Sequence, residues 1–439
     1  MSSYVDPGAA RSSGEFVALL RLRREVAGLS YRQLERRARQ DGGCLPPSTV
    51  ATMLRRSTLP SRELVVAYVR ACGGDADEVA AWVAVRTRLA TTVEAPVERR
   101  GGVPSFPVPP RQLPPCGVAL VGRRDRLAEV DAATGGAESP LVVVTGAPGV
   151  GKTALAVHWA HRVRDRFPDG QLYVELGASR PLADVLGELL AAVGVPAGSV
   201  PADDRQAAAL FRSVVADRRV LLLVDGVVTA EQVRLLRPGG SDSCMVVTSR
   251  DRLVGLAVYD GARVVETPPL ERGHAVRVLA QAAGERLVSA ELTAAGRLAE
   301  LCDRLPLALR IAATALDPSA TTPIADLVVR MRAFGRLAAL EVHGDPEVGL
   351  DAVFGRSWEA LDEVSRGLLR ALAALPPGGV TAVAAAAALE TTVALARTAL
   401  GRLVNAHLVV RLGDDRYAVP GLLREYAGSV LPAEEPAVA

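Results

Sequence analysis

The sequence predicts a multidomain protein that combines a parallel α/β sheet with several all-α regions. Short apolar runs alternate with helix-length segments in the middle of the chain, which is typical of a doubly wound parallel sheet. A Pro-rich stretch separates this middle part from an arginine-rich beginning with helical periodicity. The chain has 439 residues, 49% of them hydrophobic, which is enough apolar material for roughly two to four domains.

Composition excludes several classes of protein. The five cysteines are odd in number and outside any metal-ligand spacing, which is typical of reduced thiols. The beginning of the chain lacks a signal-peptide pattern, and no apolar run reaches the ~18 residues of a membrane span. We therefore expect a cytoplasmic protein that makes no membrane contact. The net charge of +2 favours no class of partner by itself.

The strongest motif is a phosphate-binding loop that follows a short buried strand. Residues 141–144 are apolar, and the GAPGVGKT that follows at 146–153 matches GxxxxGK[ST] at every position. The glycines let backbone N–H groups turn inward, and the next helix presents its positive N-terminus to a phosphate. Lys152 would reach the β- and γ-phosphates of ATP, and the Thr153 hydroxyl would bind Mg²⁺. The predicted nucleotide contacts along this loop are Gly146, Ala147, Pro148, Gly149, Val150, Gly151, Lys152, Thr153 and Ala154.

The choice of cation supports this interpretation. Of the 51 lysines and arginines in the chain, Lys152 is the one lysine. A slim ammonium fits inside a loop wrapped around a phosphate, whereas a planar guanidinium does not. The sequence therefore predicts a nucleotide site at this loop.

Two further predicted strands end in residues that complete the site. Residues 219–226 read RVLLLVDG, so an apolar strand ends at Asp225, a predicted Mg²⁺ ligand and catalytic carboxylate. Gly226 follows, at a position where P-loop proteins that hydrolyse ATP often carry a second acid. Residues 245–250 read MVVTSR and place Arg250 where it could sense the γ-phosphate. The carboxyl ends of these strands would meet at one edge of a parallel sheet.

The first part of the chain predicts a five-helix domain over residues 14–92. Phe16, Leu19, Leu20 and Leu22 would form the buried side of the first helix. Ser30 and Gln33 form a capping box for the second, and Trp82 would anchor the core. The five helices are expected at 15–26, 31–39, 47–56, 61–72 and 76–89.

The compact second and third helices resemble those of the phage-repressor (XRE-type) helix-turn-helix DNA-binding domain. Residues 11–70 hold twelve arginines against five acids, a charge balance that suits DNA. The resemblance implies that the second helix contacts phosphates and the third faces base edges. The alternative is a helical domain whose basic face docks protein. The predicted DNA contacts are Arg32, Gln33, Arg36, Ser48, Thr49, Thr52 and Arg55.

The segments outside these domains are expected to be irregular. Residues 93–116 contain seven prolines and predict a semi-extended linker. The first residues, 1–13, and the last, 431–439, are small and polar or Pro-rich, and we expect disordered tails there.

The order of motifs after the linker resembles the NB-ARC module of the STAND signal-transduction ATPases. In chain order these motifs are GR (122–123), the phosphate-binding loop, LLLVDG, VVTSR and RLPLAL (304–309). The resemblance implies a P-loop domain at 117–265, a helical subdomain at 266–345 and a winged helix at 346–430. It also places Arg123 near the adenine, Pro306 on the base and Arg250 at the γ-phosphate.

One triplet departs from that module. Relatives usually carry Met-His-Asp after the wing strand, and the histidine contacts the β-phosphate of ADP. Here Val419, Pro420 and Gly421 take these positions, and proline has no N–H to donate. Together with Gly226, this predicts ATP and ADP binding with slow hydrolysis and a weakened closed state.

Three functions fit these observations. The first is a nucleotide-controlled transcriptional regulator whose beginning, 14–92, binds DNA and whose body binds ATP or ADP with Mg²⁺. The second is a signalling or defence scaffold whose helical beginning binds protein and which self-associates on ATP binding. The third is an ordinary P-loop enzyme such as a DNA-remodelling ATPase, which the missing second acid disfavours.

Overall fold

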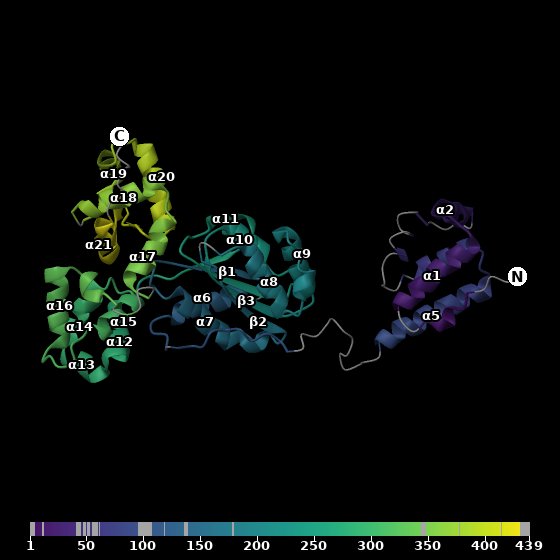
Figure 1. Cartoon of the computed structure of the whole chain (residues 1–439), viewed down its shortest axis with the longest axis horizontal. Helices are drawn as coiled ribbons and strands as arrows, with labels where there is room; N and C mark the ends of the chain where they lie inside the picture. Colours follow the sequence, from purple (N-terminus) through teal and green to yellow (C-terminus); the bar gives the residue numbers. More distant parts are fainter. Residues whose placement is uncertain are drawn as a thin grey trace. The chain divides into compact units, whose positions relative to one another are not determined.

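The computed structural model divides the chain into two compact units, residues 1–103 and 104–439, and each is considered by itself (Figure 1). The described residues are 5–10, 13–40, 45–46, 50, 53–54, 60, 62–94, 108–117, 119–135, 139–177, 180–342, 344, 348–376, 378–413 and 415–430.

The first unit is a small helical domain around an aromatic core. Phe16 and Trp82 meet edge to face with ring centroids 5.3 Å apart, and the Tyr68 hydroxyl donates to the Leu20 carbonyl at 3.1 Å. The helices predicted around 61–72 and 76–89 are confirmed. The third predicted helix lies mostly outside the described residues. The elements are η1 (Pro7–Ala9), α1 (Ser13–Ala27), α2 (Tyr31–Gln40), α4 (Arg62–Ala71) and α5 (Ala76–Glu94).

The buried side of α1 differs from the prediction. Leu22 is 45% exposed, while Arg23 is buried and pairs with Glu78 of α5 at 2.6 Å. Phe16, Leu20 and Arg23 are spaced by four and three residues, so they share one face of the helix. Leu22 falls outside that face, and an arginine occupies the core position because a carboxylate partner meets it there.

The second unit contains a five-stranded parallel sheet in the order β2-β3-β4-β1-β5. Alternate residues of β1 point to opposite sides. Leu141 and Val143 pack with the helices α8 to α11, and Val142 and Val144 pack with α6 and α7. The phosphate-binding loop therefore leaves the carboxyl end of a strand covered on both faces. The strands are β1 (Leu141–Thr145), β2 (Gly170–Glu175), β3 (Val220–Val227), β4 (Cys244–Ser249) and β5 (Arg263–Glu266).

Helices on both faces complete this α/β domain and confirm the predicted doubly wound class. They are α6 (Arg124–Thr134), α7 (Lys152–Val163), η2 (Arg164–Arg166), α8 (Leu182–Ala192), η3 (Ala197–Ser199), α9 (Asp204–Val215), α10 (Ala230–Leu236) and α11 (Val254–Tyr259).

Part of the predicted linker is attached to this domain. The Gln171 N–H of β2 donates to the Pro110 carbonyl at 2.7 Å, and the Gln112 N–H donates to the Gln171 carbonyl at 2.8 Å. Residues 110–112 thus pair with the edge strand β2, which the proline count alone did not predict.

The helical subdomain and the winged helix share one continuous apolar core. The winged helix carries a small sheet in the order β6-β8-β7, as its hairpin-like sequence predicts. The helices are α12 (Arg272–Ala283), α13 (Glu285–Ala290), α14 (Leu292–Leu301), α15 (Pro306–Thr314), α16 (Pro323–Phe334), η4 (Ala338–Leu340), α17 (Leu350–Glu359), α18 (Glu363–Ala374), α19 (Ala382–Ala388), α20 (Val393–Asn405) and α21 (Gly421–Ser429). The strands are β6 (Val380–Thr381), β7 (Val410–Arg411) and β8 (Arg416–Ala418).

Within the described ranges, no single helix is long and apolar enough to span a membrane. The pair α19 and α20 meets the same test only when the two are taken together, and they are bent by 105° at the break between them.

Candidate nucleotide site

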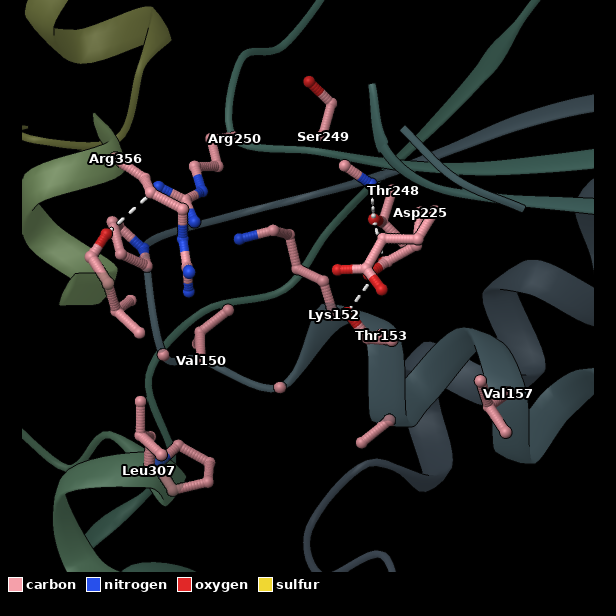
Figure 2. Close-up of a pocket in the computed structure, with 18 of the residues that line it drawn as sticks. Val150, Lys152, Thr153, Val157, Asp225, Thr248, Ser249, Arg250, Leu307 and Arg356 are labelled. Atoms are coloured by element: carbon pink, nitrogen blue, oxygen red, sulfur yellow. Dashed lines mark hydrogen bonds between the residues drawn. The ribbon is translucent and has the colours of Figure 1, made fainter. Parts of the chain in front are cut away.

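A pocket of about 910 Å³ opens where the second unit's three subdomains meet (Figure 2). The phosphate-binding loop and the ends of β3 and β4 form one side of it. The start of α15 in the helical subdomain and α17 of the winged helix form the rest. The pocket therefore brings together residues that the sequence separates by more than two hundred positions.

The loop backbone needs its glycines. Gly146 lies so close to the Thr267 carbonyl that a Cβ would collide with it. Gly151 has φ of +93° directly before α7 begins at Lys152. Both conformations suit glycine and not other residues. The predicted loop contacts from Pro148 to Ala154 all line the pocket.

Lys152 lies at the centre of the loop. Its Nζ donates to the carbonyls of Gly146 at 2.8 Å and Ala147 at 3.0 Å. Burial, and then the charge of Arg250, lower the pKa of Lys152 to about 7. A buried ammonium held only by neutral carbonyls is costly, and an anionic phosphate in the pocket would compensate it. The loop and its lysine therefore fit a bound nucleotide.

Asp225 is held at the end of β3 by two hydroxyls. Thr153 Oγ1 donates to its Oδ1 at 2.7 Å, and Thr248 Oγ1 of β4 donates to the same oxygen at 2.5 Å. This leaves a carboxylate and a threonine oxygen side by side, a donor set that suits Mg²⁺. Sequence reasoning missed Thr248, although it lies within the VVTSR motif.

Gly226 has a backbone conformation that disfavours a second acid. Its φ is +76°, next to a register shift between β3 and β4. A glutamate or aspartate at this position would be strained, because its Cβ disfavours positive φ.

Arg250, the predicted sensor, is bound by the winged helix. Its Nη1 donates to the Val353 carbonyl at 3.0 Å and to Ser357 Oγ at 2.7 Å, both on α17. Burial, and then the charge of Arg356, lower the pKa of Arg250. The guanidinium is thus committed to α17 in this arrangement.

Arg123 and Pro306 support the loop. Arg123 is buried and donates to the carbonyls of Pro268 at 2.7 Å and Val150 at 2.9 Å. Pro306 is the first residue of α15 and lines the pocket beside Gly151. Arg123 also lines the pocket, and its guanidinium already donates to two backbone carbonyls.

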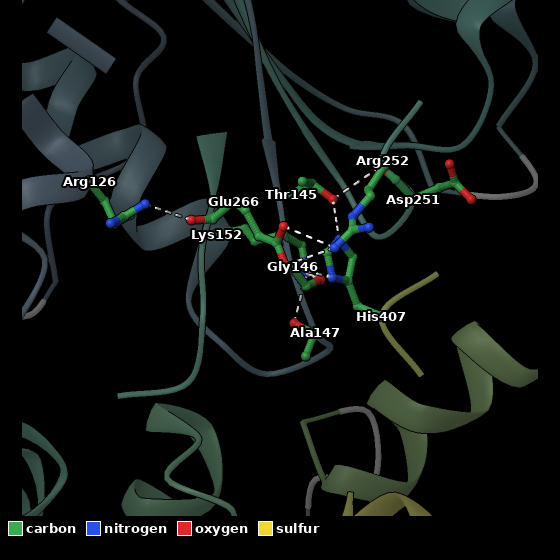
Figure 3. Close-up of polar contacts among 9 residues, drawn as sticks. All are labelled: Arg126, Thr145, Gly146, Ala147, Lys152, Asp251, Arg252, Glu266 and His407. Atoms are coloured by element: carbon green, nitrogen blue, oxygen red, sulfur yellow. Dashed lines mark hydrogen bonds and ion pairs between the residues drawn. The ribbon is translucent and has the colours of Figure 1, made fainter. Parts of the chain in front are cut away.

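A histidine that the sequence did not indicate reaches the base of the loop (Figure 3). His407, between α20 and β7, lies with Nε2 2.9 Å from Thr145 Oγ1 and Nδ1 3.6 Å from a Glu266 oxygen. The neighbouring Arg252 N–H donates to the Asn405 carbonyl at 3.2 Å. Burial is the main cause that lowers the pKa of His407 to about 4. The winged helix therefore contacts the nucleotide domain at the residue preceding Gly146.

The triplet that departs from the module's pattern lies elsewhere. A Cβ on Gly421 would meet the side chains of Arg336 and Asp303, and the Leu422 N–H donates to Asp303 at 2.7 Å. The described residues that line the pocket include neither Val419 nor Pro420 nor Gly421. This segment faces the helical subdomain.

The predicted DNA contacts are described only in part. Ser30 N–H donates to Gln33 Oε1 at 2.8 Å, which confirms the capping box, and Arg36 is exposed on α2. Arg32 belongs to α2, but its side chain lies outside the described structure. Ser48, Thr49, Thr52 and Arg55 lie outside the described residues.

Comparisons with known proteins identify two kinds of domain in this chain. Residues 15–82 match the family model of a helix-turn-helix domain, and residues 125–289 match that of the NB-ARC domain. Two relatives, each named Regulatory protein AfsR, are 34% identical over 333 residues (Streptomyces griseus) and 35% identical over 330 residues (Streptomyces coelicolor). The matches cover 74% and 72% of this chain but 34% and 33% of those proteins, so the chain spans about a third of their length.

Solved structures are similar to this chain at a lower sequence identity. A STAND protein with a tetratricopeptide repeat sensor from Pyrococcus horikoshii has 16% identity and a TM-score of 0.36, with 77% of this chain and 45% of that chain covered. A Walker-type ATPase of Pyrococcus abyssi has 13% identity and a TM-score of 0.44, with 71% and 96% covered. These values carry no argument about function. The family matches show that the chain contains a helix-turn-helix domain at residues 15–82 and an NB-ARC domain at residues 125–289.

Proposed function

We propose that this chain is a nucleotide-controlled, DNA-binding regulator of transcription, and that the structure is its closed arrangement. The observation that carries this proposal is the double attachment of the winged helix to the nucleotide domain. Arg250 is bound to α17, and His407 is bound to the end of β1. Both contacts involve residues next to the phosphate-binding machinery, so the winged helix and the nucleotide must influence each other.

The contacts support a two-state switch. The Nη1 of Arg250 is occupied by Val353 and Ser357 on α17, and from this we infer that the closed arrangement suits ADP. ATP would favour an open arrangement in which Arg250 leaves α17. A ligand shifts such an equilibrium only through its different affinities for the two states.

The site would hold its ligands with residues already in place. The loop N–H groups and Lys152 would bind the phosphates, and Thr153 and Asp225 would bind Mg²⁺. A bound Mg²⁺ would neutralise phosphate charge. Because Gly226 disfavours a second acid, we expect a multiple-turnover ATPase rate below roughly 1 s⁻¹.

The first unit supports DNA as the partner. It belongs to a helix-turn-helix family, it is rich in arginine, and the relatives that cover most of this chain are named regulatory proteins. We propose that α2 contacts phosphates through Arg36 and that the segment around 48–55 faces the bases.

DNA binding by the full chain tests this function. Labelled genomic fragments are titrated with the chain in ADP and in a non-hydrolysable ATP analogue, each at 50 and 200 mM salt. We expect affinity that falls steeply with salt, because phosphate contacts release counterions, and that differs between the nucleotides. Absence of DNA binding at low salt in both nucleotides would overturn the regulator proposal and favour a protein-binding scaffold.

A further inference from the structure

Arg356 lines the pocket and has no hydrogen-bond or ion-pair partner among the described residues. Arg356 lies on α17, directly before the Ser357 that binds Arg250, and it points into the pocket toward the side of Lys152 (Figure 2). Among the described residues, no carboxylate or carbonyl binds its guanidinium. Two arginines side by side without an acid between them repel each other, and this charge contributes to the lowered pKa of Arg250.

Two of the acids that line the pocket are already engaged. Asp225 accepts from Thr153 and Thr248, and Asp362 pairs with Arg402 at 2.7 Å. Within the described structure, six cationic side chains line the pocket against four carboxylates. The site therefore carries an excess of positive charge that a bound anion would neutralise.

At residues 419–421, where the NB-ARC module usually carries Met-His-Asp, the winged helix has no side-chain hydrogen-bond donor. Val419 and Gly421 have no polar side chain, and Pro420 has neither a polar side chain nor an N–H. They also face the helical subdomain, where Gly421 lies against Arg336 and Asp303. A donor from the winged helix to a phosphate must therefore come from another element.

We propose that Arg356 is that donor and binds the β-phosphate of ADP from α17, opposite Lys152. This inference rests on the proposed function, since it assigns a residue to the same nucleotide site. The guanidinium reaches the pocket only while the winged helix lies on the nucleotide domain. Arg356 thus makes ADP affinity depend on closure and replaces the contact missing at residue 420.

Calorimetric titration of the full chain with ADP and with a non-hydrolysable ATP analogue tests this role. We expect Arg356→Gln to weaken ADP binding about 10- to 100-fold, the value of a charge-assisted hydrogen bond, and ATP-analogue binding less than about 3-fold. Arg356→Lys keeps the charge and should retain more ADP affinity than Arg356→Gln. Arg356 is exposed, so neither substitution removes core packing. The control is Arg397→Gln, which removes an exposed arginine of α20 that is not among the residues lining the pocket.

Failure of this inference can be distinguished from failure of the proposed function. Unchanged ADP affinity in Arg356→Gln, or equal losses for both nucleotides, would overturn the role of Arg356 while nucleotide binding by the unaltered chain still stands. If the unaltered chain binds neither nucleotide, the proposed function fails and this inference fails with it.

Discussion

At the scale of single residues, the site is built on ammonium and guanidinium groups that are not interchangeable. Lys152 is nearly enclosed by its own loop, and its partners are the carbonyls of Gly146 and Ala147. Arginines line the same pocket from α15, from α17 and from the residue that follows β4. The one lysine of the chain is therefore placed by the size of the space and not by charge alone.

Lys152→Arg tests this size argument. We expect nucleotide affinity to fall about 10- to 100-fold although the charge is kept, because the guanidinium cannot lie within the loop. Fluorescence titration with a labelled ADP measures the loss. The exposed Arg397→Lys is the matched control and should bind as the unaltered chain does. Equal affinities for Lys152→Arg and the unaltered chain would contradict the argument.

His407 predicts a dependence on pH. Its pKa is lowered to about 4, from an ordinary 6.5, mainly by burial, with Glu266, Arg252, Lys152 and Asp251 as the facing charged groups. A group whose pKa is lower in the closed form binds fewer protons there than in the unfolded chain. The stability that it contributes is therefore complete above about pH 6.5 and is lost as the pH falls toward 4.

Melting temperatures between pH 5 and 7.5 check this expectation. The full chain should melt at progressively lower temperature below pH 6.5, and His407→Gln, which cannot titrate, should show a shallower decrease. His161→Gln is the control, since His161 contacts the Pro114 carbonyl and not the phosphate-binding loop. Parallel curves for His407→Gln and the unaltered chain would show that His407 does not titrate on unfolding.

At the scale of elements, helix packing in the first unit depends on an ion pair. Arg23 of α1 and Glu78 of α5 lie 2.6 Å apart, with side chains 7% and 12% exposed. The glutamate's hydrogen bond is the main cause that raises the pKa of Arg23, against the opposing effect of burial. This pair joins the first and last helices of the unit, so α1 turns Arg23 and not Leu22 toward the core.

Glu78→Gln should destabilise the first unit by about 3 kcal/mol, because it leaves a buried guanidinium without its counter-charge. Urea unfolding of the full chain, followed by amide hydrogen exchange within α1 and α5, measures this loss. The matched control is Glu35→Gln, whose partner Arg39 is 73% exposed, and a surface pair of this kind contributes at most about 1 kcal/mol. Similar losses for both variants would contradict the assigned role of burial.

At the scale of the whole second unit, the winged helix contacts the nucleotide domain through two separate segments. Ser357 and Val353 hold Arg250 from α17, while His407 holds Thr145 from beyond α20. Both segments adjoin the apolar core shared by the winged helix and the helical subdomain, so in the proposed switch they would move together. Contacts that are each worth about 1 kcal/mol can then bias one common equilibrium.

The double variant Ser357→Ala/His407→Ala should reduce the preference for ADP over ATP by about 10-fold, because both substitutions weaken the closed arrangement. The ratio of the two dissociation constants in the full chain gives the result. Each single variant should produce a smaller change in the same direction. A ratio that stays constant across the three variants would show that these contacts do not set the nucleotide preference.

The sequence by itself determined the phosphate-binding loop, the strand that ends at Asp225, the parallel sheet and the order of domains. These features depend on local patterns: apolar runs, glycines at fixed spacing, and capping residues such as Ser30 and Gln33. Local patterns carry over directly into structure because neighbouring residues satisfy them.

Only the tertiary structure decided where Arg250, Arg356 and His407 lie. His407 and Thr145 are 262 residues apart, and the sequence between them contains no pattern that indicates their contact. Similarly, the exposure of Leu22 depends on where Glu78 lies, and the attachment of residues 110–112 depends on a free edge of β2. Each of these outcomes is set by the packing of distant elements, which defines the surroundings of a side chain and therefore its charge state, its partner and its role.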